Sequence, residues 1–344
     1  MRVFGRIATV CIFACIAAAC SRDEESARRN VAPTQPLVVY SSLPEEVVKA
    51  ITAAYTAQSS MPINYMLDSE RTLIDKLVRK AHRPGADLLL IPDAGHLTFA
   101  VEADVLRPVI SAQLQQSVPA NLRDPDHYWF GLSTNAVSIV YDDRAVDPAK
   151  LSGYAALGEK IWAGRLCLLS SATTSSRSLV AFLIAELGEK NAEAVVRRWR
   201  KNLAAPVFSK GRDLLRAIED GICKVAFVSS ADIAEKVLEG TVHHVGIHWP
   251  RAKEGGTQLT LLGAGVTRHA NNPENALEFL EWLAAEPGQR ILARSARGFP
   301  ANVAVKPARP LDRWVGFDLS PIDAAALGYL HQEASLLIER SGYR

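Results

Sequence analysis

Short apolar runs alternate with amphipathic segments along the chain, and this alternation limits the fold more than any other feature. An apolar run at Leu37–Tyr40 has the length and continuity of a buried strand, and we predict further strands at Ile63–Met66 and Ala86–Ile91. The segments between them, 44–55 and 69–80, have the patterning of helices. Strands that alternate with helices predict an α/β fold with a parallel sheet, whose functional loops lie at the carboxyl ends of the strands.

The same alternation continues through the second half of the chain. The segment Trp129–Leu132 leads into an apolar run at Ala136–Tyr141, which we predict to cross into a second lobe. Roughly 310 residues follow residue 36, enough for two lobes with separate cores. Further strands are predicted at 165–169, 225–228 and 259–266, and further helices at 177–187, 213–220, 273–284, 287–296 and 321–339.

The first 36 residues predict an export signal, a lipid anchor and a tether. Residues 1–19 combine a basic start with an apolar stretch too short to span a bilayer. Cys20 directly follows three alanines and resembles the box of bacterial lipoproteins, in which this cysteine is diacylated; the alternative is ordinary cleavage beside a coincidental cysteine. Ser21 leaves open which membrane carries the anchor. Residues 20–36 contain the anchor and a polar, flexible tether.

Charge and cysteine content limit the partners of the exported chain. Removal of residues 1–19 takes two arginines from the 39 basic residues, so 37 basic residues balance 37 acidic ones. This balance predicts no nucleic-acid partner. Cys167 and Cys223 remain after export and lipidation of Cys20. An oxidising compartment permits a disulfide between them, and two buried free thiols are the alternative.

No set of residues indicates catalysis or a bound cofactor. The sequence has no nucleophile elbow, phosphate-binding loop or paired catalytic acids, so we do not expect an enzyme. His243, His244 and His248 lack the spacing of a metal site and are predicted to be surface residues.

Segments in a defined order resemble type 1 extracellular solute-binding proteins, most closely the ferric-ion-binding branch. The segments are Val39–Ser42, Ala86–Leu88, Val140–Asp142, the Ser/Thr turn 170–176, Ala217–Gly221, Glu278–Leu283, Glu286–Gln289 and Gly298–Pro300. The resemblance covers about residues 37–344. It implies a monomeric, two-lobed periplasmic receptor with the type II fold, in which each lobe is a mainly parallel sheet flanked by helices. A cleft between the lobes would bind a small solute for delivery to the inner-membrane permease of an ABC importer.

The resemblance also implies how the chain divides and where the lobes pivot. We expect one lobe to comprise 37–130 and 265–305, and the other 131–264 and 306–344. Hinge strands are expected near Gly131 and Gly265.

The chain departs from the ferric branch at the metal-binding positions. A histidine of the family is matched by Pro44, and an acidic ligand by Pro92, beside Asp93. The paired tyrosines of the family are matched by Ala231 and Asp232. Ferric ion prefers phenolate, carboxylate and imidazole ligands, so we do not expect a ferric site of the usual kind.

Three loops rich in hydroxyl groups follow strands and would face the implied cleft. Hydroxyls and helix N-termini bind anions, although capping of the helices needs no ligand. Carboxylates at Asp93, Asp232 and the pair Glu45/Glu46 suit a cation instead, and either aspartate could be a helix N-cap. A zwitterionic solute would reconcile the two signals. The predicted ligand-binding residues are Ser41, Ser42, Asp93, Ser171, Thr173, Thr174, Arg177, Ser229, Ser230 and Asp232, with no catalytic or metal-ligating residue and no cofactor.

The sequence therefore predicts a lipid-anchored periplasmic receptor that captures a small polar or anionic solute for an ABC importer. One alternative is binding of ferric or another metal ion through non-standard ligands. Another is a solute-sensing regulatory lipoprotein, which the sequence does not distinguish from a transport receptor.

Overall fold

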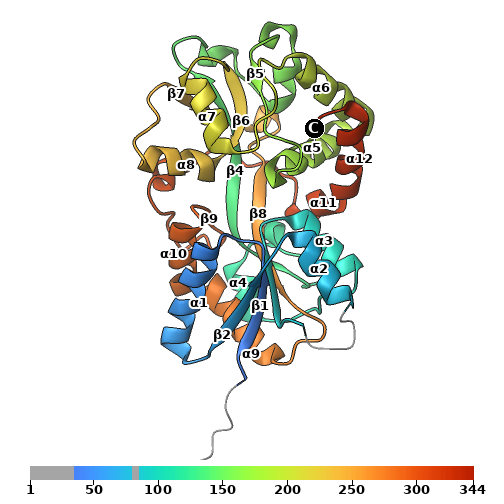
Figure 1. Ribbon diagram of the computed structural model, residues 1–344, viewed down its shortest axis with the longest axis vertical. Helices are drawn as coiled ribbons and strands as arrows, with labels where there is room; N and C mark the ends of the chain where they lie inside the picture. Colours follow the sequence, from blue (N-terminus) through green and yellow to red (C-terminus); the bar gives the residue numbers. More distant parts are fainter. Residues whose placement is uncertain (1–34, 80–84) are drawn as a thin grey trace, which may run out of the picture. The chain divides into compact units, whose positions relative to one another are not determined.

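Two long strands connect the two lobes of the fold. β4 (Phe130–Asp142) and β8 (Leu259–Val266) are paired antiparallel, and Figure 1 shows both strands passing from the lower lobe to the upper one. The computed structural model describes residues 35–79 and 85–344, so the predicted leader, Cys20 and nearly all of the tether lie outside the described residues. Among the described helices, none combines the length and apolarity needed to cross a bilayer.

The first lobe, the lower one in Figure 1, is built on the three predicted N-terminal strands. β1 (Leu37–Ser41) lies between β2 (Ile63–Leu67) and β3 (Leu88–Ile91), with all three parallel. β8 then pairs antiparallel with β3, so the predicted α/β class is confirmed with a mixed sheet. Parallel strands covered on both faces explain why β1 and β3 are almost wholly buried.

Helices cover both faces of this sheet. One core includes the aromatic rings of Tyr55, Phe279 and Trp282, and the other includes Trp129. The helices of this lobe are α1 (Glu45–Ser59), α2 (Glu70–Arg79), α3 (Ala94–Glu102), α4 (Ala112–Ser117), α9 (Pro273–Ala284) and α10 (Glu286–Ser295).

The second lobe is built around the distal part of β4. β6 (Val225–Ser229) and β7 (Val245–His248) pair antiparallel with β4, and β5 (Leu166–Cys167) pairs parallel with β6. Its helices are α5 (Thr174–Leu187), α6 (Glu189–Lys201), α7 (Gly211–Glu219) and α8 (Ser230–Leu238). A disulfide joins Cys167 to Cys223 in the core of this lobe. Of the two alternatives that the sequence left open, the structure has the disulfide and not the two free thiols.

Short elements connect these parts. They are β9 (Phe299–Pro300), which pairs with β4, and the 3₁₀ turns η1 (Ala120–Leu122), η2 (Pro148–Lys150), η3 (Tyr154–Gly158), η4 (Lys160–Trp162), η5 (Ala252–Glu254) and η6 (Leu311–Arg313).

The C-terminal segment contacts both lobes. The single helix predicted at 321–339 is wrong in detail, because the structure has α11 (Ala324–Tyr329) and α12 (His331–Ser341). Gly328, a poor helix former, lies just before the break. α11 packs against α3 of the first lobe, and α12 packs against α5 and α6 of the second. The lobe boundaries inferred from the sequence stay a prediction.

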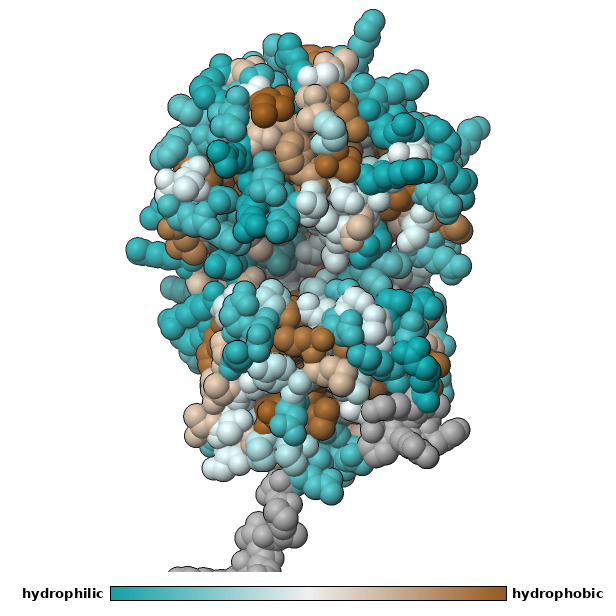
Figure 2. Space-filling model, viewed as in Figure 1, coloured by the Kyte–Doolittle hydropathy of each residue, from teal (hydrophilic) through white to brown (hydrophobic). Residues whose placement is uncertain are grey.

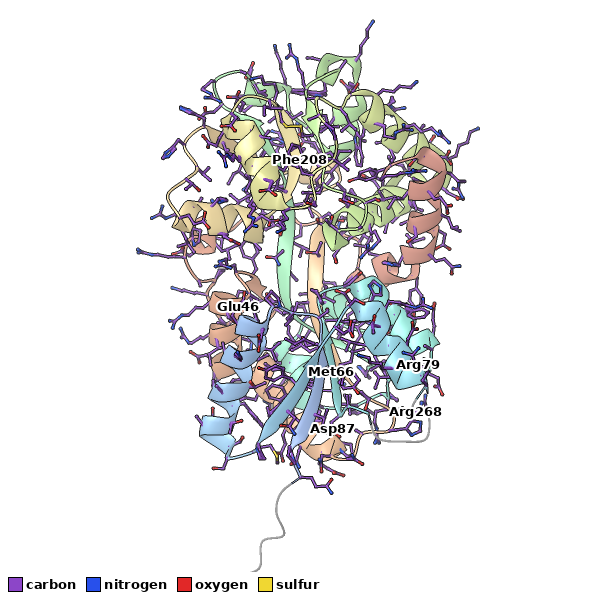
Figure 3. All side chains as sticks on the ribbon, viewed as in Figure 1. Glu46, Met66, Arg79, Asp87, Phe208 and Arg268 are labelled. Carbon is purple, nitrogen blue, oxygen red and sulfur yellow. A yellow bond between two sulfur atoms is a disulfide. The ribbon has the colours of Figure 1, made fainter. Side chains whose placement is uncertain are left out.

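Asp87, a buried acid at the far end of the first lobe, serves the fold. Asp87 accepts hydrogen bonds from the N–H groups of Val38, at 2.8 Å, and Asn272, at 2.9 Å. Figure 3 labels Asp87 toward the outer end of the lobe, away from the second lobe. Asp93 follows the opposite end of β3, and this difference in position separates a structural acid from a candidate binding acid.

Candidate functional site

Asp93 is held at the inner end of the first lobe by its role as a helix cap. It follows β3 in an extended conformation, and its Oδ1 accepts the N–H of Gly95 at 2.8 Å. Its Oδ2 lies 2.7 Å from Nδ1 of His96, one turn along α3. The side chain is almost fully buried. The capping role that the sequence allowed is therefore present, and it uses Oδ1, while Oδ2 contacts side chains.

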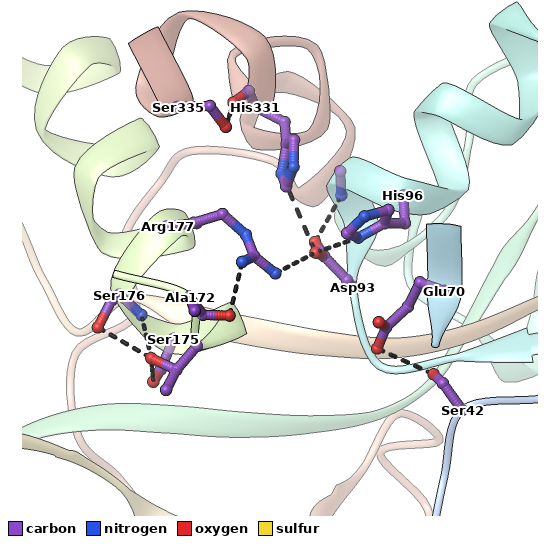
Figure 4. A network of polar contacts seen from close by, with 12 residues as sticks. Ser42, Glu70, Asp93, His96, Ala172, Ser175, Ser176, Arg177, His331 and Ser335 are labelled. Atoms are coloured by element: carbon purple, nitrogen blue, oxygen red, sulfur yellow. Dashed lines mark hydrogen bonds and ion pairs between the residues drawn. The ribbon is translucent and has the colours of Figure 1, made fainter. Parts of the chain in front are cut away.

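Two residues from distant parts of the chain complete what we call the Asp93 cluster, namely Asp93, His96, Arg177 and His331. Nη2 of Arg177, on α5, lies 3.7 Å from Oδ2 of Asp93. Nδ1 of His331, the first residue of α12, lies 4.0 Å from the same oxygen. Figure 4 shows the guanidinium and both imidazoles directed toward this carboxylate. The cluster thus joins the first lobe, the second lobe and the C-terminal segment.

The cluster shifts the pKa values of two of its members, Asp93 and His331. Burial raises the pKa of Asp93, but the hydrogen bond with His96 and the nearby His331 and Arg177 outweigh it, so the pKa lies below its ordinary value. Burial lowers the pKa of His331, and His96 and Arg177 lower it further, against the opposing effect of Asp93. Both shifts are downward, so this environment favours the ionised form of Asp93 and the neutral form of His331.

Arg177 has a hydrogen-bonding group that the described protein atoms do not use. Its Nη1 donates to the carbonyl oxygen of Ala172 at 2.6 Å. Its Nε is buried and has no hydrogen-bond partner among the described residues. An unpaired buried donor costs about 1–3 kcal/mol, more when it is charged. The cluster therefore has capacity for an additional acceptor.

Among the predicted ligand-binding residues of the first lobe, only Asp93 belongs to the cluster. Ser41 is buried, and its Oγ donates to the carbonyl oxygen of Leu90 at 2.8 Å. Ser42 donates to Oε1 of Glu70 at 2.9 Å, as Figure 4 shows. Both hydroxyls thus have partners within the lobe, and a ligand role for them stays a prediction.

The predicted hydroxyls of the second lobe act mainly at helix starts. Thr173 caps α5 by accepting the N–H of Ser176 at 3.3 Å, and Ser229 caps α8 by accepting the N–H of Ala231 at 3.2 Å. The buried Ser230 hydroxyl accepts the N–H of Ala136. Thr173 and Ser229 thus have the capping roles that need no ligand, and Ser230 links α8 to β4. Ser171 and Thr174 lie half-buried on the same turn as Thr173.

Asp232 lies half-buried at the wall of a hollow in the second lobe, together with Thr173 and Lys210. The start of α7 packs on its carboxylate, since a Cβ added at Gly211 would fall 2.3 Å from Cγ of Asp232. Burial, with a smaller effect of Glu235, raises the pKa of Asp232 to about 6. The structure therefore brings two predicted residues, Thr173 and Asp232, to one surface.

The sequence did not identify His96 and His331. His96 stands three residues after Asp93, a spacing that brings side chains together in the first turn of a helix. His331 carries no comparable signal, because only the packing of α11 and α12 brings it to α3. The sequence predicted no metal ligand, yet ligand atoms of Asp93, His96 and His331 lie within 4.8 Å of one another. They are the one such group of three within residues 35–79 and 85–344.

This chain is similar to known proteins along most of its length. Residues 36–298 match the family model described as bacterial extracellular solute-binding protein. Iron uptake protein A1 of Synechocystis sp. is 27% identical over 319 residues, covering 90% of this chain and 88% of the relative. Iron uptake protein A2 of the same organism is 29% identical over 333 residues, covering 92% of each.

Solved structures of similar proteins superpose on this chain over most of its length. A Trichodesmium protein (IdiA, FutA) in complex with iron and citrate ligands superposes with a TM-score of 0.84 at 28% identity, covering 90% of this chain and 100% of the other. A ferric binding protein from Campylobacter jejuni superposes with a TM-score of 0.83 at 25% identity, with the same coverage.

Proposed function

This chain belongs to the bacterial extracellular solute-binding proteins, and we propose that its cargo is a small charged solute held at the Asp93 cluster. The chain is the solute-binding component of an ABC importer, as its family and its iron-uptake relatives indicate. The identity of the cargo and the residues that hold it are the proposed part.

One observation carries the proposal, which is the approach of Arg177 to Asp93 across the two lobes. Asp93 is fixed at the start of α3, whereas Arg177 lies on α5, and their charged groups are 3.7 Å apart. A solute at this point would contact both lobes. Binding would therefore favour the closed form through contacts that the open form lacks.

The charges of the cluster suit a solute that is charged rather than merely polar. Arg177 supports the anionic cargo predicted from the sequence. Asp93 and its two imidazole neighbours support a cation. The names of the relatives add metal uptake as a specific candidate. We do not expect ferric binding by phenolates, because the family resemblance matches Ala231 and Asp232 to the paired tyrosines of the ferric branch.

The proposal includes the predicted attachment to the membrane. Cys20 would carry the lipid, and the folded receptor would act as a monomer at the end of its tether on the periplasmic side. Cys20→Ala should release the exported chain from membranes into the soluble fraction. If the exported variant still sediments with membranes as the wild type does, Cys20 is not the anchor.

Ligand-induced stabilisation tests the proposed cargo site. The full chain is screened by thermal unfolding against small anions, amines and metal ions, since a ligand that binds only the folded state raises the melting temperature. At least one class should stabilise the wild type and contract it in small-angle scattering. Asp93→Asn, which can still cap α3, and Arg177→Gln should each weaken this response.

The control is Arg251→Gln, which removes an arginine that pairs with Glu254 at 2.8 Å outside the cluster. Its ligand response should equal that of the wild type. Absence of stabilisation by all three classes of solute would refute the proposal, and so would an undiminished response in both cluster variants.

A further inference from the structure

We propose that the Asp93 cluster binds a divalent transition-metal ion, with Asp93, His96 and His331 as the protein ligands. This inference rests on the proposed receptor function and names the class of its cargo. It assigns a role to two histidines that neither the sequence motifs nor the hydroxyl-rich loops account for. It also differs from a ferric site, because the three ligands are one carboxylate and two imidazoles.

The spacing of the three side chains is close to that of a coordination sphere. Metal bonds of about 2.0–2.2 Å to nitrogen and oxygen place neighbouring ligand atoms roughly 3–4 Å apart. Oδ2 of Asp93 lies 2.7 Å from Nδ1 of His96 and 4.0 Å from Nδ1 of His331. The ligand atoms are all within 4.8 Å of one another. Side-chain movements on the order of 1 Å would suffice to place an ion between them.

The protein backbone is shaped to admit His331 at this point. A Cβ added at Gly95 would lie 2.1 Å from Nδ1 of His331, so only glycine leaves room for the ring in its observed position. Gly328 plays a similar part on α11, where a Cβ would lie 2.2 Å from Oγ1 of Thr98. Two close approaches thus seat the C-terminal segment on α3 and bring a histidine to the carboxylate that α3 presents.

A hydrogen-bonded cluster without an ion is the competing interpretation. It accounts for Asp93 and His96, which form a short contact within one helical turn. It does not account for His331, whose Nδ1 is too far from Asp93 for a hydrogen bond yet faces the same oxygen. It also leaves the buried Nε of Arg177 without an acceptor. An ion with acceptor ligands on its open positions would explain both features.

The ligand types favour a divalent ion over ferric ion. Two imidazoles and one carboxylate with open positions form the set that suits Fe²⁺, Zn²⁺ and related ions. Ferric ion prefers harder oxygen donors, and the cluster offers a single carboxylate. The positive charge of Arg177 next to Asp93 adds repulsion, which grows in proportion to the charge of the ion. Charge and ligand chemistry therefore both favour a divalent ion over ferric ion.

Calorimetric titration of the full chain, freed of metal with a chelator, tests the inference. Zinc, cobalt(II) and anaerobic iron(II) are the probes, with ferric citrate as the comparison. We expect one divalent ion per chain and weaker or no binding of ferric ion. His331→Gln and His96→Gln should each lower the affinity at least tenfold. Bound cobalt(II) should show visible absorption bands that change in both variants, a signature that a merely structural role of the histidines would not move.

The matched control is His244→Gln. His244 lies outside the cluster but also beside a carboxylate, with its Nδ1 3.4 Å from Oδ1 of Asp143. Its affinity should be unchanged. No divalent binding, or equal binding in the wild type and both cluster variants, would overturn the metal site. If metals fail while an organic solute still binds in a manner that depends on Asp93, the receptor function stands. If no solute binds at all, the receptor proposal fails as well.

Discussion

At the scale of single residues, Gly95 determines whether the Asp93 cluster can form. Its missing side chain is the space that His331 occupies. In most helices an alanine would stabilise by up to about 1 kcal/mol relative to glycine. Here the same methyl group would push the imidazole away from Asp93. Gly95 coordinates no metal itself, yet it controls the position of His331, one of the proposed metal ligands.

Gly95→Ala should consequently lower divalent-metal affinity at least tenfold while leaving α3 folded. The physical reason is the displacement of the His331 ring, so the effect should vanish when His331 is already absent. Calorimetry on the single and double variants measures this coupling. If Gly95→Ala lowers the metal affinity by the same factor in the wild-type and His331→Gln backgrounds, the account is contradicted.

Asp232 gives a second prediction at this scale, on stability against pH. Burial raises its folded pKa from 3.8 to about 6. Between about pH 4 and pH 6 the folded state therefore holds a proton that the unfolded state has lost, so stability falls as pH rises through this window. Asp232→Asn should remove this fall. The difference in unfolding free energy between variant and wild type should grow by about 1–3 kcal/mol from pH 4 to pH 7 in urea titrations. A constant difference would show that the carboxyl titrates normally.

Only the part of the site with local sequence signals could be predicted from the sequence. Asp93 and Arg177 could be found from the sequence because strand ends and first helical turns have local signals. His331 could not, because its contact depends on how a distant helix packs. The serines and threonines carried the right local signal for capping, and the same signal was compatible with anion binding, which is why sequence alone could not separate the two.

At the scale of elements, the strands were easier to predict than the C-terminal helices. β1 and β3 are continuous apolar runs buried on both faces, so composition alone reveals them. The antiparallel insertion of β8 next to β3 has no local signal, because it depends on the chain returning from the second lobe. For the same reason the sequence predicted one helix where the structure has two, of which α11 packs against both α3 and α5 and α12 packs against α5 and α6.

The disulfide is the element-scale feature with the largest expected effect on stability. It closes a loop of 56 residues between β5 and the turn before β6. The chain-entropy model gives about 4 kcal/mol for a loop of this length. Replacing both Cys167 and Cys223 by alanine should lower the free energy of unfolding by about 2–5 kcal/mol, measured by urea denaturation. Stability equal to that of the wild type would mean that the pair is reduced in the native protein.

At the scale of the whole folded unit, ion pairs among the described residues 36–79 and 85–344 link the lobes at more than one place. Arg177 approaches Asp93, and Arg297 lies 3.8 Å from Glu235 of α8. Figure 2 shows the surface hollowed between the lobes, with hydrophilic side chains along the rim. Exposed pairs such as Arg297–Glu235 contribute little, about 0–1 kcal/mol, so closure depends on what binds at the buried Asp93 cluster. The hinge strands expected near Gly131 and Gly265 lie within β4 and β8.

Native mass spectrometry of the intact chain tests most directly whether the cargo binds at this cluster. The chain is loaded with zinc, cobalt(II) or iron(II), and the wild type is compared with Asp93→Asn. The account predicts a single added mass on the wild type that is lost or strongly reduced in the variant, while the variant keeps a folded charge distribution. An identical added mass on both proteins, or none on the wild type, would contradict it.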